Sequence, residues 1–378
     1  MGLLSGPEGC VLSCSMLSPV RARWKTPPMR SYAAFEISPA LMCYLGQVGV
    51  SVVGRPRRVN RGGVEVRHVR WTAGRTLHRM PSDPTLRGGN ATSEFIEVRR
   101  DDGVVLITLD HASTRNALGT EMAAELYAEL EAFESNDLDR VLVLTGRDPS
   151  FCSGANIRRF DETIGRIEQE EGARAERQPL PWGDMEARLG QRASEKAEAG
   201  FGSVSNVPLR ISEVQKPTIA AVNGHAIGVG LGLALSCDIR IASEKAEFAE
   251  AFVRMGLVPG DGSCWQLPRL IGLSNTYYMQ YTGDRLSADE AYRMGLVSRV
   301  HPHEEMLSAA MEFAGRLASG ATYSMSLTKY LVQRSFDMGF GDSLRLAQTA
   351  QELARRSDDH KEAVRAFLDK RRPEFKGR

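Results

Sequence analysis

Two stretches of small residues carry the most chemically suggestive pattern in this 378-residue chain. The first, at residues 151–157, reads FCSGANI and follows an apolar run at 140–145. The second, at residues 223–232, reads NGHAIGVGLG and follows an apolar run at 218–222. Small residues let a backbone bend tightly, and a glycine-rich helix start leaves N–H groups unpaired at the positive end of the helix dipole. One N–H group from each segment, converging on one point, would form an oxyanion hole.

A dinucleotide site is the main rival interpretation of the glycine segment. The G-x-G-x-x-G pattern that starts at Gly228 would need a third glycine at position 233, where the chain has Leu233. A Rossmann domain also typically begins with this unit, whereas here it lies deep in the chain. The oxyanion interpretation is therefore favoured.

The surrounding pattern predicts alternating strands and helices. Short β-rich apolar runs predict strands at 104–110, 140–145, 218–222, 238–242 and 296–300. Apolar residues at helical spacing predict a helix through Met122 and Phe133, and Ser287 with Glu290 forms a capping box before a short helix. Three further helical stretches are predicted at about 303–318, 322–338 and 342–370. The predicted fold class is α/β with a helical C-terminal region.

The chain divides by charge near residue 90. Residues 1–90 hold thirteen basic and four acidic residues, a formal charge of +9, and the remainder carries −8. We predict a basic, disordered leader or upstream extension at 1–92, a core at 93–302 with a polar insertion at 158–210, and a helical region at 303–378. The leader could instead be a transit peptide, an anion-binding tail, or sequence upstream of a true start at Met80. The insertion could be a lid over a pocket or a solvated surface excursion.

The overall composition is that of an ordinary globular protein. With 42% hydrophobic and 25% charged residues, the chain is no collagen, no wholly disordered chain and no disulfide-dense mini-protein. No apolar run reaches the roughly 18 residues of a membrane span, and the net charge of +1 predicts no nucleic-acid or membrane partner. The six cysteines form no CxxC pair and no zinc-binding spacing, so no metal is predicted. Reduced thiols predict a cytoplasmic protein, or a mitochondrial one if the leader is a transit peptide.

Four motifs together resemble the enoyl-CoA hydratase/isomerase (crotonase) superfamily. They are FCSGANI, KPTIAAVNGHAIGVGLGLALSCDIRIAS at 216–243, GLVPGDGSCWQLPRLIG at 256–272 and TGDRLSADEAYRMGLVSRV at 282–300. The resemblance implies a crotonase-like spiral of ββα units. It also implies trimers, often paired into hexamers, with C-terminal helices at the subunit contacts.

The same resemblance implies an acyl-CoA thioester substrate whose enolate is held by two backbone amides. The matching motifs assign those amides to Ala155 and Val229, although the family usually has glycine at the second place. Arg158 matches a position where family members place a basic residue against coenzyme A, and Lys329, on a late predicted helix, is a second basic candidate. Either residue could instead be an ordinary solvated cation. No cofactor is implied beyond the coenzyme A that forms part of the substrate.

This chain departs from the family pattern where the hydratases carry their two carboxylates. The helix opened by the glycine segment has Gly232 at one of these positions, and the segment after Phe248 has Phe252 at the other. Water addition needs one group to activate water and another to handle the α-proton. The sequence therefore favours isomerase-type proton transfer over hydration. The alternative is a non-catalytic homologue that only binds acyl-CoA.

Two acidic residues near these positions could still move a proton. Asp261 lies in the loop where related isomerases place their acid/base carboxylate, and it could equally form an Asx turn before the next helix. Glu250 lies close in sequence to the missing second carboxylate, and its alternative role is a structural salt bridge. Phe252 and Trp265 are candidates for the substrate pocket, although Trp265 could belong to the core. His225 and Cys152 are expected to pack rather than react.

Overall fold

The computed structural model of this protein describes residues 93–156, 164–165 and 203–378. The predicted leader at 1–92, most of the predicted insertion and Arg158 lie outside the described residues. The fold below is that of the part of the chain from residue 93 onwards.

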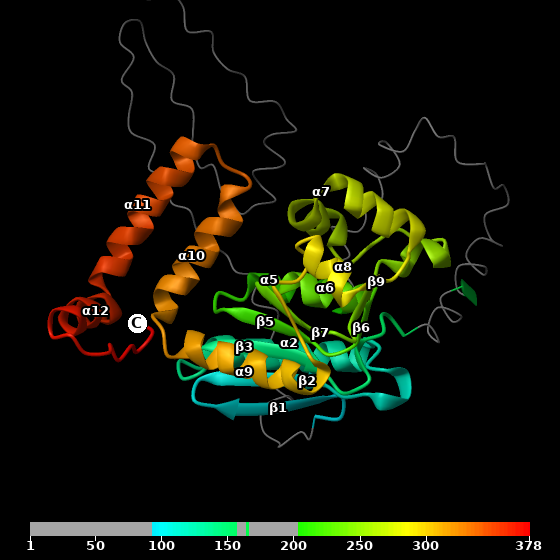
Figure 1. Cartoon of the computed structure of the whole chain (residues 1–378), viewed down its shortest axis with the longest axis horizontal. Coiled ribbons are helices and arrows are strands. Elements are labelled where there is room, and N and C mark those ends of the chain that lie inside the picture. The colour runs from blue at the N-terminus through cyan, green and yellow to red at the C-terminus, as the bar shows by residue number, and fades with distance from the viewer. Residues whose placement is uncertain (1–92, 157–163, 166–202) are drawn as a thin grey trace, which may run out of the picture. The chain divides into compact units, whose positions relative to one another are not determined.

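A six-stranded sheet forms the base of the fold, in the order β1-β2-β3-β5-β7-β10 (Figure 1). Its strands are β1 Ile96–Asp101, β2 Val104–Leu109, β3 Val141–Gly146, β5 Thr218–Val222, β7 Ile239–Ser243 and β10 Arg299–His301. The first pair is an antiparallel hairpin, and every other pair is parallel. Helices cover both faces of the sheet, which explains why β3 and β5 are buried at every residue and largely apolar rather than alternating.

A second, smaller sheet is formed mainly by short strands that follow the carboxyl ends of strands in the large sheet. It contains β4 Ser150–Cys152, β6 His225–Ile227, β8 Glu247–Ala249 and β9 Leu286–Ser287, in that order. The first three of these strands are parallel, and each follows a strand of the large sheet after a short turn. The chain therefore forms three successive pairs of strands, β3 with β4, β5 with β6 and β7 with β8. In each pair, the first strand belongs to the large sheet and the second to the small one. This arrangement agrees with the spiral that the family resemblance implies.

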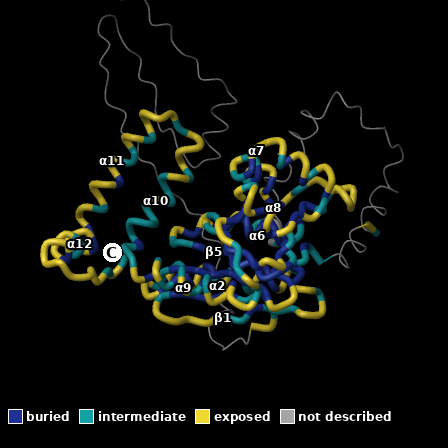
Figure 2. The backbone as a smooth tube through the Cα atoms, viewed as in Figure 1, coloured by how far each residue is buried: buried dark blue, intermediate teal, exposed yellow. Residues whose placement is uncertain are grey.

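The core consists of two apolar clusters, one on each face of the large sheet. On one face, the buried side chains of α2 Thr120–Ser135, α5 Ser203–Glu213 and α6 Val229–Ser236 pack together. The predicted helical stripe of Met122, Leu126, Leu130 and Phe133 is buried there. On the other face, α9 His303–Ala318 packs Met306 and three alanines against the strands. Figure 2 shows this buried centre in dark blue.

The C-terminal region is helical, as predicted, but its boundaries differ from the prediction. After α9 come α10 Thr322–Ser335, α11 Phe340–Arg356 and α12 Asp358–Leu368. The single helix predicted at 342–370 is two helices, because the Ser357 side chain caps a new one by accepting from the His360 amide. Figure 2 shows α11 and α12 exposed along much of their length. No helix in the described ranges is long and apolar enough to cross a membrane.

The strand predicted at 296–300 is also shorter than expected. Strand β10 covers Arg299–His301, whereas Leu296 folds back as a turn, donating from its amide to the Ala291 carbonyl. Leu296 is buried in the core after α8 Ala288–Arg293. The apolar residue that suggested a strand therefore belongs to a buried turn. The capping box that begins α8 is confirmed, with Ser287 and Glu290 exchanging hydrogen bonds.

Candidate active site

Three parallel strands of the small sheet end at one edge, and each end carries a residue of the candidate site. The register pairs Ser150 of β4 with His225 of β6, and Ile227 of β6 with Ala249 of β8. The carboxyl ends of parallel strands lie at the same edge of a sheet, which is where ligands bind in open α/β folds. The segments that start at Ser153, Gly228 and Glu250 therefore lie next to one another.

The first segment presents the Ala155 amide. Gly154 has φ +109°, a conformation that side chains rarely tolerate, and its Cα lies against the Ile227 carbonyl so closely that an added Cβ would stand 3.0 Å from that oxygen. Leu118 donates to the Gly154 carbonyl, which holds this peptide in place. Among the backbone hydrogen bonds of the described residues, none uses the Ala155 N–H group as donor. The turn therefore leaves that N–H group available beside the β6 end.

The second segment presents the Val229 amide at the start of α6. Gly228 donates to the Ala249 carbonyl at 2.8 Å, and the helix begins at the next residue. A first-turn N–H group has no acceptor within its own helix, and the helix dipole makes this end positive. In the described part of the chain, no carbonyl accepts from Val229. The Ala155 and Val229 amides thus flank the same junction of β4 and β6.

Asp261 brings a carboxyl group to this helix from the loop before α7 Ser263–Thr282. The side chain is only 3% exposed. Its Oδ1 accepts from the Ser263 amide at 3.1 Å and from the Ser263 hydroxyl at 2.7 Å, which is the turn predicted as the structural alternative. Its Oδ2 has no hydrogen-bond partner among the described residues. Burial raises the pKa of the Asp261 carboxyl, and the Ser263 hydrogen bonds oppose that shift.

Gly232 provides the space that Asp261 occupies. A Cβ added at position 232 would stand 2.7 Å from Asp261 Oδ2 and 2.8 Å from Asp261 Cβ. Position 232 lies three residues after Val229 on α6, so one helical turn separates it from the candidate oxyanion amide. Asp261 therefore brings its carboxyl group to the place where the family resemblance puts a hydratase glutamate.

Glu250 is fully buried directly after β8. Neither of its carboxyl oxygens has a hydrogen-bond partner in the described ranges. The structural salt bridge considered for Glu250 is not formed with any described residue. Burial raises the pKa of this carboxyl well above its usual value, and the nearby charge of Asp261 raises it further. A buried polar group without a hydrogen-bond partner lowers the free energy of unfolding. The presence of a glutamate at position 250 is therefore not explained by a contribution to stability.

We expect Glu250→Gln to stabilise the protein increasingly as pH rises. Because the folded-state pKa is raised, the folded protein keeps its Glu250 proton above about pH 4.3, where the unfolded chain releases it. Stability is then lost as pH rises toward the folded-state pKa, whereas glutamine stays neutral throughout. Thermal melting at about pH 5 and pH 8 should show a gain of roughly 1–3 kcal/mol at the higher pH. Glu247→Gln, at a partly buried site on β8, is the control, and an equal effect of both variants would contradict this prediction.

The two predicted pocket residues lie in different surroundings. The Phe252 ring lies 3.5 Å from the Cβ position of Gly228, beside the start of α6. Trp265 is 49% exposed on α7, where its ring packs edge-on against Phe336 and lies beneath the Arg269 guanidinium. The structure therefore brings Phe252, but not Trp265, to the Gly228–Val229 segment.

The predicted cation and the two other candidates have structural partners. Lys329 is 8% exposed at its side chain and forms a 3.0 Å ion pair with Asp238, so its charge is already paired. His225 lies between Ser150 and Glu247, in keeping with a packed, hydrogen-bonded residue. Burial raises the pKa of the Cys152 thiol to about 11, which keeps it in the unreactive thiol form.

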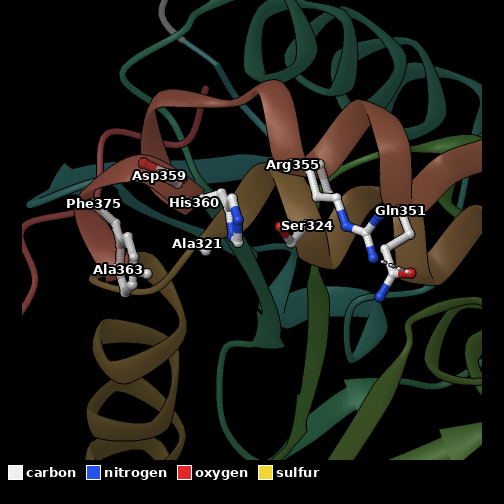
Figure 3. A pocket seen from close by; sticks show the side chains of 9 residues that line it. Ala321, Ser324, Gln351, Arg355, Asp359, His360, Ala363 and Phe375 are labelled. Carbon is white, nitrogen blue, oxygen red and sulfur yellow. Dashed lines mark hydrogen bonds between the residues drawn. The ribbon is translucent and has the colours of Figure 1, made fainter. Parts of the chain in front are cut away.

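A cavity among the C-terminal helices contains none of these candidates. It has a volume of about 270 Å³ and lies between α10, α11, α12 and the final residues (Figure 3). Figure 3 shows that its polar lining includes Ser324, Arg355 and His360. This cavity is separate from the edge of the small sheet where the candidate site lies.

The chain belongs to the enoyl-CoA hydratase/isomerase family, because the sequence model of that family matches residues 99–180 and 183–378. A 1,2-epoxyphenylacetyl-CoA isomerase from Escherichia coli is 33% identical over 75% of this chain and 99% of its own length. A crotonyl-CoA hydratase from Syntrophomonas wolfei is 31% identical over 75% of this chain and 98% of its own. The crystal structure of an enoyl-CoA hydratase subunit I from Geobacillus kaustophilus superimposes with a TM-score of 0.62 and 35% identity, covering 75% of this chain and 98% of that one.

One hydrogen-bond partner of the candidate residue Asp261 was missed by sequence reasoning. Ser263 donates twice to Asp261 and thereby orients its carboxyl group toward Gly232. The signal was present, because a serine two residues after an aspartate in Asp261-Gly262-Ser263 is well placed to bond back to the aspartate side chain. The sequence carries no comparable signal that the Asp261 side chain fills the volume left free by Gly232. That contact depends on how the loop before α7 packs against α6.

Proposed function

We propose that this protein is an isomerase that moves a carbon–carbon double bond in an acyl-CoA thioester. In this proposal, Ala155 and Val229 donate their backbone N–H groups to the thioester oxygen, and Asp261 moves the proton. Phe252 forms part of the wall of the acyl pocket. The relatives support a coenzyme A thioester as substrate, because the Escherichia coli relative is named for a CoA-thioester isomerase and the Syntrophomonas relative for a CoA-thioester hydratase.

The observation that carries the proposal is the position of Asp261 Oδ2. This oxygen is buried, has no partner among the described residues, and lies against Gly232, one helical turn after Val229. A base must lie within reach of the carbon next to the thioester that the oxyanion amides hold. A raised pKa also suits a carboxylate that must accept a proton and then return it.

The proposed reaction begins with a 3-enoyl thioester whose carbonyl oxygen lies between the two amides. The Asp261 carboxylate accepts the proton from the α-carbon, and the electron pair of that C–H bond delocalises onto the thioester oxygen. The Ala155 and Val229 N–H groups stabilise this enolate, each contributing roughly 3–4 kcal/mol in comparable sites. Protonation at the γ-carbon then returns the electrons and leaves the double bond in conjugation with the thioester.

The missing hydratase acids support this choice over hydration. Position 232 has no side chain, and position 252 carries an apolar ring next to Gly228. Neither position can therefore supply a carboxyl group to activate a water molecule. A shift of a double bond adds no water and needs only a group that removes and returns protons.

A panel of 2-enoyl- and 3-enoyl-CoA thioesters tests the proposed function. We expect a 3-enoyl-CoA to gain the ultraviolet absorbance of a conjugated enoyl thioester without a change of mass. Hydration would instead add the mass of one water and remove that absorbance. Tight binding of every thioester with no product would mean that the protein is the non-catalytic acyl-CoA-binding homologue.

The same proposal includes assembly into trimers or pairs of trimers. Its support is the apolar surface that the C-terminal helices leave exposed, which includes Phe340, Leu344, Phe367 and Leu368. Exposed apolar patches of this kind mark contact surfaces between chains.

A further inference from the structure

Two buried carboxyl groups, those of Glu250 and Asp261, interact electrostatically and lie in unequal surroundings. Glu250 is 0% exposed and Asp261 is 3% exposed. Three of their four carboxyl oxygens, both of Glu250 and Oδ2 of Asp261, have no hydrogen-bond partner among the described residues. Protein interiors rarely leave such atoms unpaired, so a cluster of three needs an explanation other than packing.

The surroundings of the two carboxyl groups differ in the hydrogen bonds that they provide. Asp261 receives two hydrogen bonds from Ser263, and these bonds stabilise its ionised form. Burial and the negative charge of Asp261 raise the pKa of Glu250 well above its usual value, although the Ser263 hydroxyl acts on Glu250 in the opposite direction. Two carboxyl groups whose surroundings separate their proton affinities are the typical mark of an acid and a base in one site.

Little else that can ionise faces Glu250. On α7, the Cys264 thiol interacts with both acids, and burial raises its pKa, so it stays neutral. Helix α6, from Val229 to Ser236, carries no ionisable side chain. On β6, His225 interacts with Ser150 and Glu247 at the start of the neighbouring strand. Among the described residues, Asp261 is therefore the charged group that governs the proton on Glu250.

The backbone places Glu250 beside the oxyanion segment. Glu250 directly follows Ala249, whose carbonyl accepts from Gly228 at 2.8 Å. Gly228 in turn precedes Val229, and the Phe252 ring lies against it. The backbone of Glu250 therefore lies next to the residue that begins the oxyanion segment, and the Asp261 carboxyl group lies against Gly232 of α6.

We propose that Glu250 is a second catalytic residue, the neutral acid that delivers the proton to the substrate after Asp261 has removed one. This inference rests on the proposed isomerisation and assigns its two proton transfers to two different groups. It makes the site a two-carboxyl isomerase site, in which neither acid stands at the positions that the hydratases use.

The steps balance without any further reactant. Asp261 starts as a carboxylate, and Glu250 starts as a carboxylic acid. The α C–H bond breaks, its proton goes to Asp261, and its electron pair moves onto the thioester oxygen. The enolate electrons then form a C–H bond at the γ-carbon with the Glu250 proton, which leaves Glu250 as a carboxylate. Transfer of the proton from Asp261 to Glu250 restores the starting state.

The Glu250→Gln variant of the full chain separates the two transfers. Glutamine keeps the size and neutrality of the protonated acid but has no acidic proton to give. With 3-hexenoyl-CoA as the probe in deuterium oxide, we expect the variant to exchange the α-hydrogen at a rate close to that of the parent protein. Isomerisation, followed by ultraviolet absorbance, should fall roughly 10²- to 10⁴-fold, the usual value of a positioned acid.

The pH profile gives a readout that a purely structural role would not move. The parent kcat/KM should fall at high pH, where Glu250 loses its proton, and at low pH, where Asp261 gains one. Glu250→Gln should lose the high-pH fall and keep the low-pH one. Glu247→Gln is the matched control on β8, because Glu247 pairs with Arg285 and His225 outside the site, and its profile should match that of the parent.

Each remaining outcome is decisive. Parent-like isomerisation by Glu250→Gln would overturn the role of Glu250 and leave the proposed function intact. Loss of both exchange and isomerisation in Glu250→Gln would also overturn it, because Glu250 would then be needed before the second transfer. Absence of exchange and isomerisation in the parent protein would refute the proposed function itself. A cooperative melting transition shows that the variant is folded.

Discussion

Asp261→Asn is expected to lose roughly 10²- to 10⁴-fold in the rate of isomerisation while still binding acyl-CoA. The amide keeps the size of the side chain and can accept the Ser263 hydrogen bonds at the same oxygen. It cannot accept a proton from the α-carbon, so only the positioning by the oxyanion amides remains. Steady-state turnover of 3-hexenoyl-CoA and titration with a saturated acyl-CoA measure the two properties separately.

Asp284→Asn is the control for this substitution. Asp284 is an exposed aspartate just after α7 and forms an ion pair with Arg254, so its loss should change turnover little. Unchanged turnover in Asp261→Asn would remove Asp261 from the mechanism and leave Glu250 as the remaining acid. Loss of α-hydrogen exchange together with isomerisation would agree with the proposed first step.

Gly154→Ala is expected to lower turnover roughly 10²- to 10³-fold, the usual cost of one oxyanion donor. Gly154 has φ +109° and touches the Ile227 carbonyl, so a side chain there forces the backbone to a different conformation. The peptide that must rotate is the one that carries the Ala155 N–H group. Turnover and binding of the saturated acyl-CoA should therefore fall together, because the thioester oxygen loses a partner in both.

Gly295→Ala separates this effect from ordinary backbone strain. Gly295 also has a positive φ, +82°, but it lies in the turn after α8 and belongs to none of the three strand ends. Both variants should lose a comparable stability, of about 1–3 kcal/mol, by thermal melting. Equal losses of turnover would mean that strain alone, and not the Ala155 amide, accounts for the effect of Gly154→Ala.

The elements that position the site were predictable because local signals and burial agree in them. The strands around 141–146 and 218–222 are mostly apolar on both faces, which is typical of strands that are buried on both faces. The two small-residue segments after them mark sharp turns at the sheet edge. Strand ends that lie at one edge place the segments after β4 and β6 next to one another, so this neighbourhood followed from the order of elements.

The partners of individual side chains were not predictable in the same way. The charge of Lys329 is taken by Asp238, a residue distant in the chain that only the packing of α10 brings near. The Glu250 carboxyl lacks the partner that a salt bridge would require, and no pattern in the sequence indicates an unpaired acid. Such pairings depend on tertiary contacts, whereas periodicity and turn signals are local.

The contact between position 232 and Asp261 makes the two positions sterically dependent on each other. A side chain on α6 at 232 and a carboxyl group from the loop at 261 would fill the same volume, since even a Cβ would come within 2.7 Å of Asp261 Oδ2. A substitution that adds a side chain at position 232 must therefore be accompanied by a smaller or displaced residue at position 261. The identity of the residue at 232 and the position of the carboxyl group at 261 have to be considered as a pair.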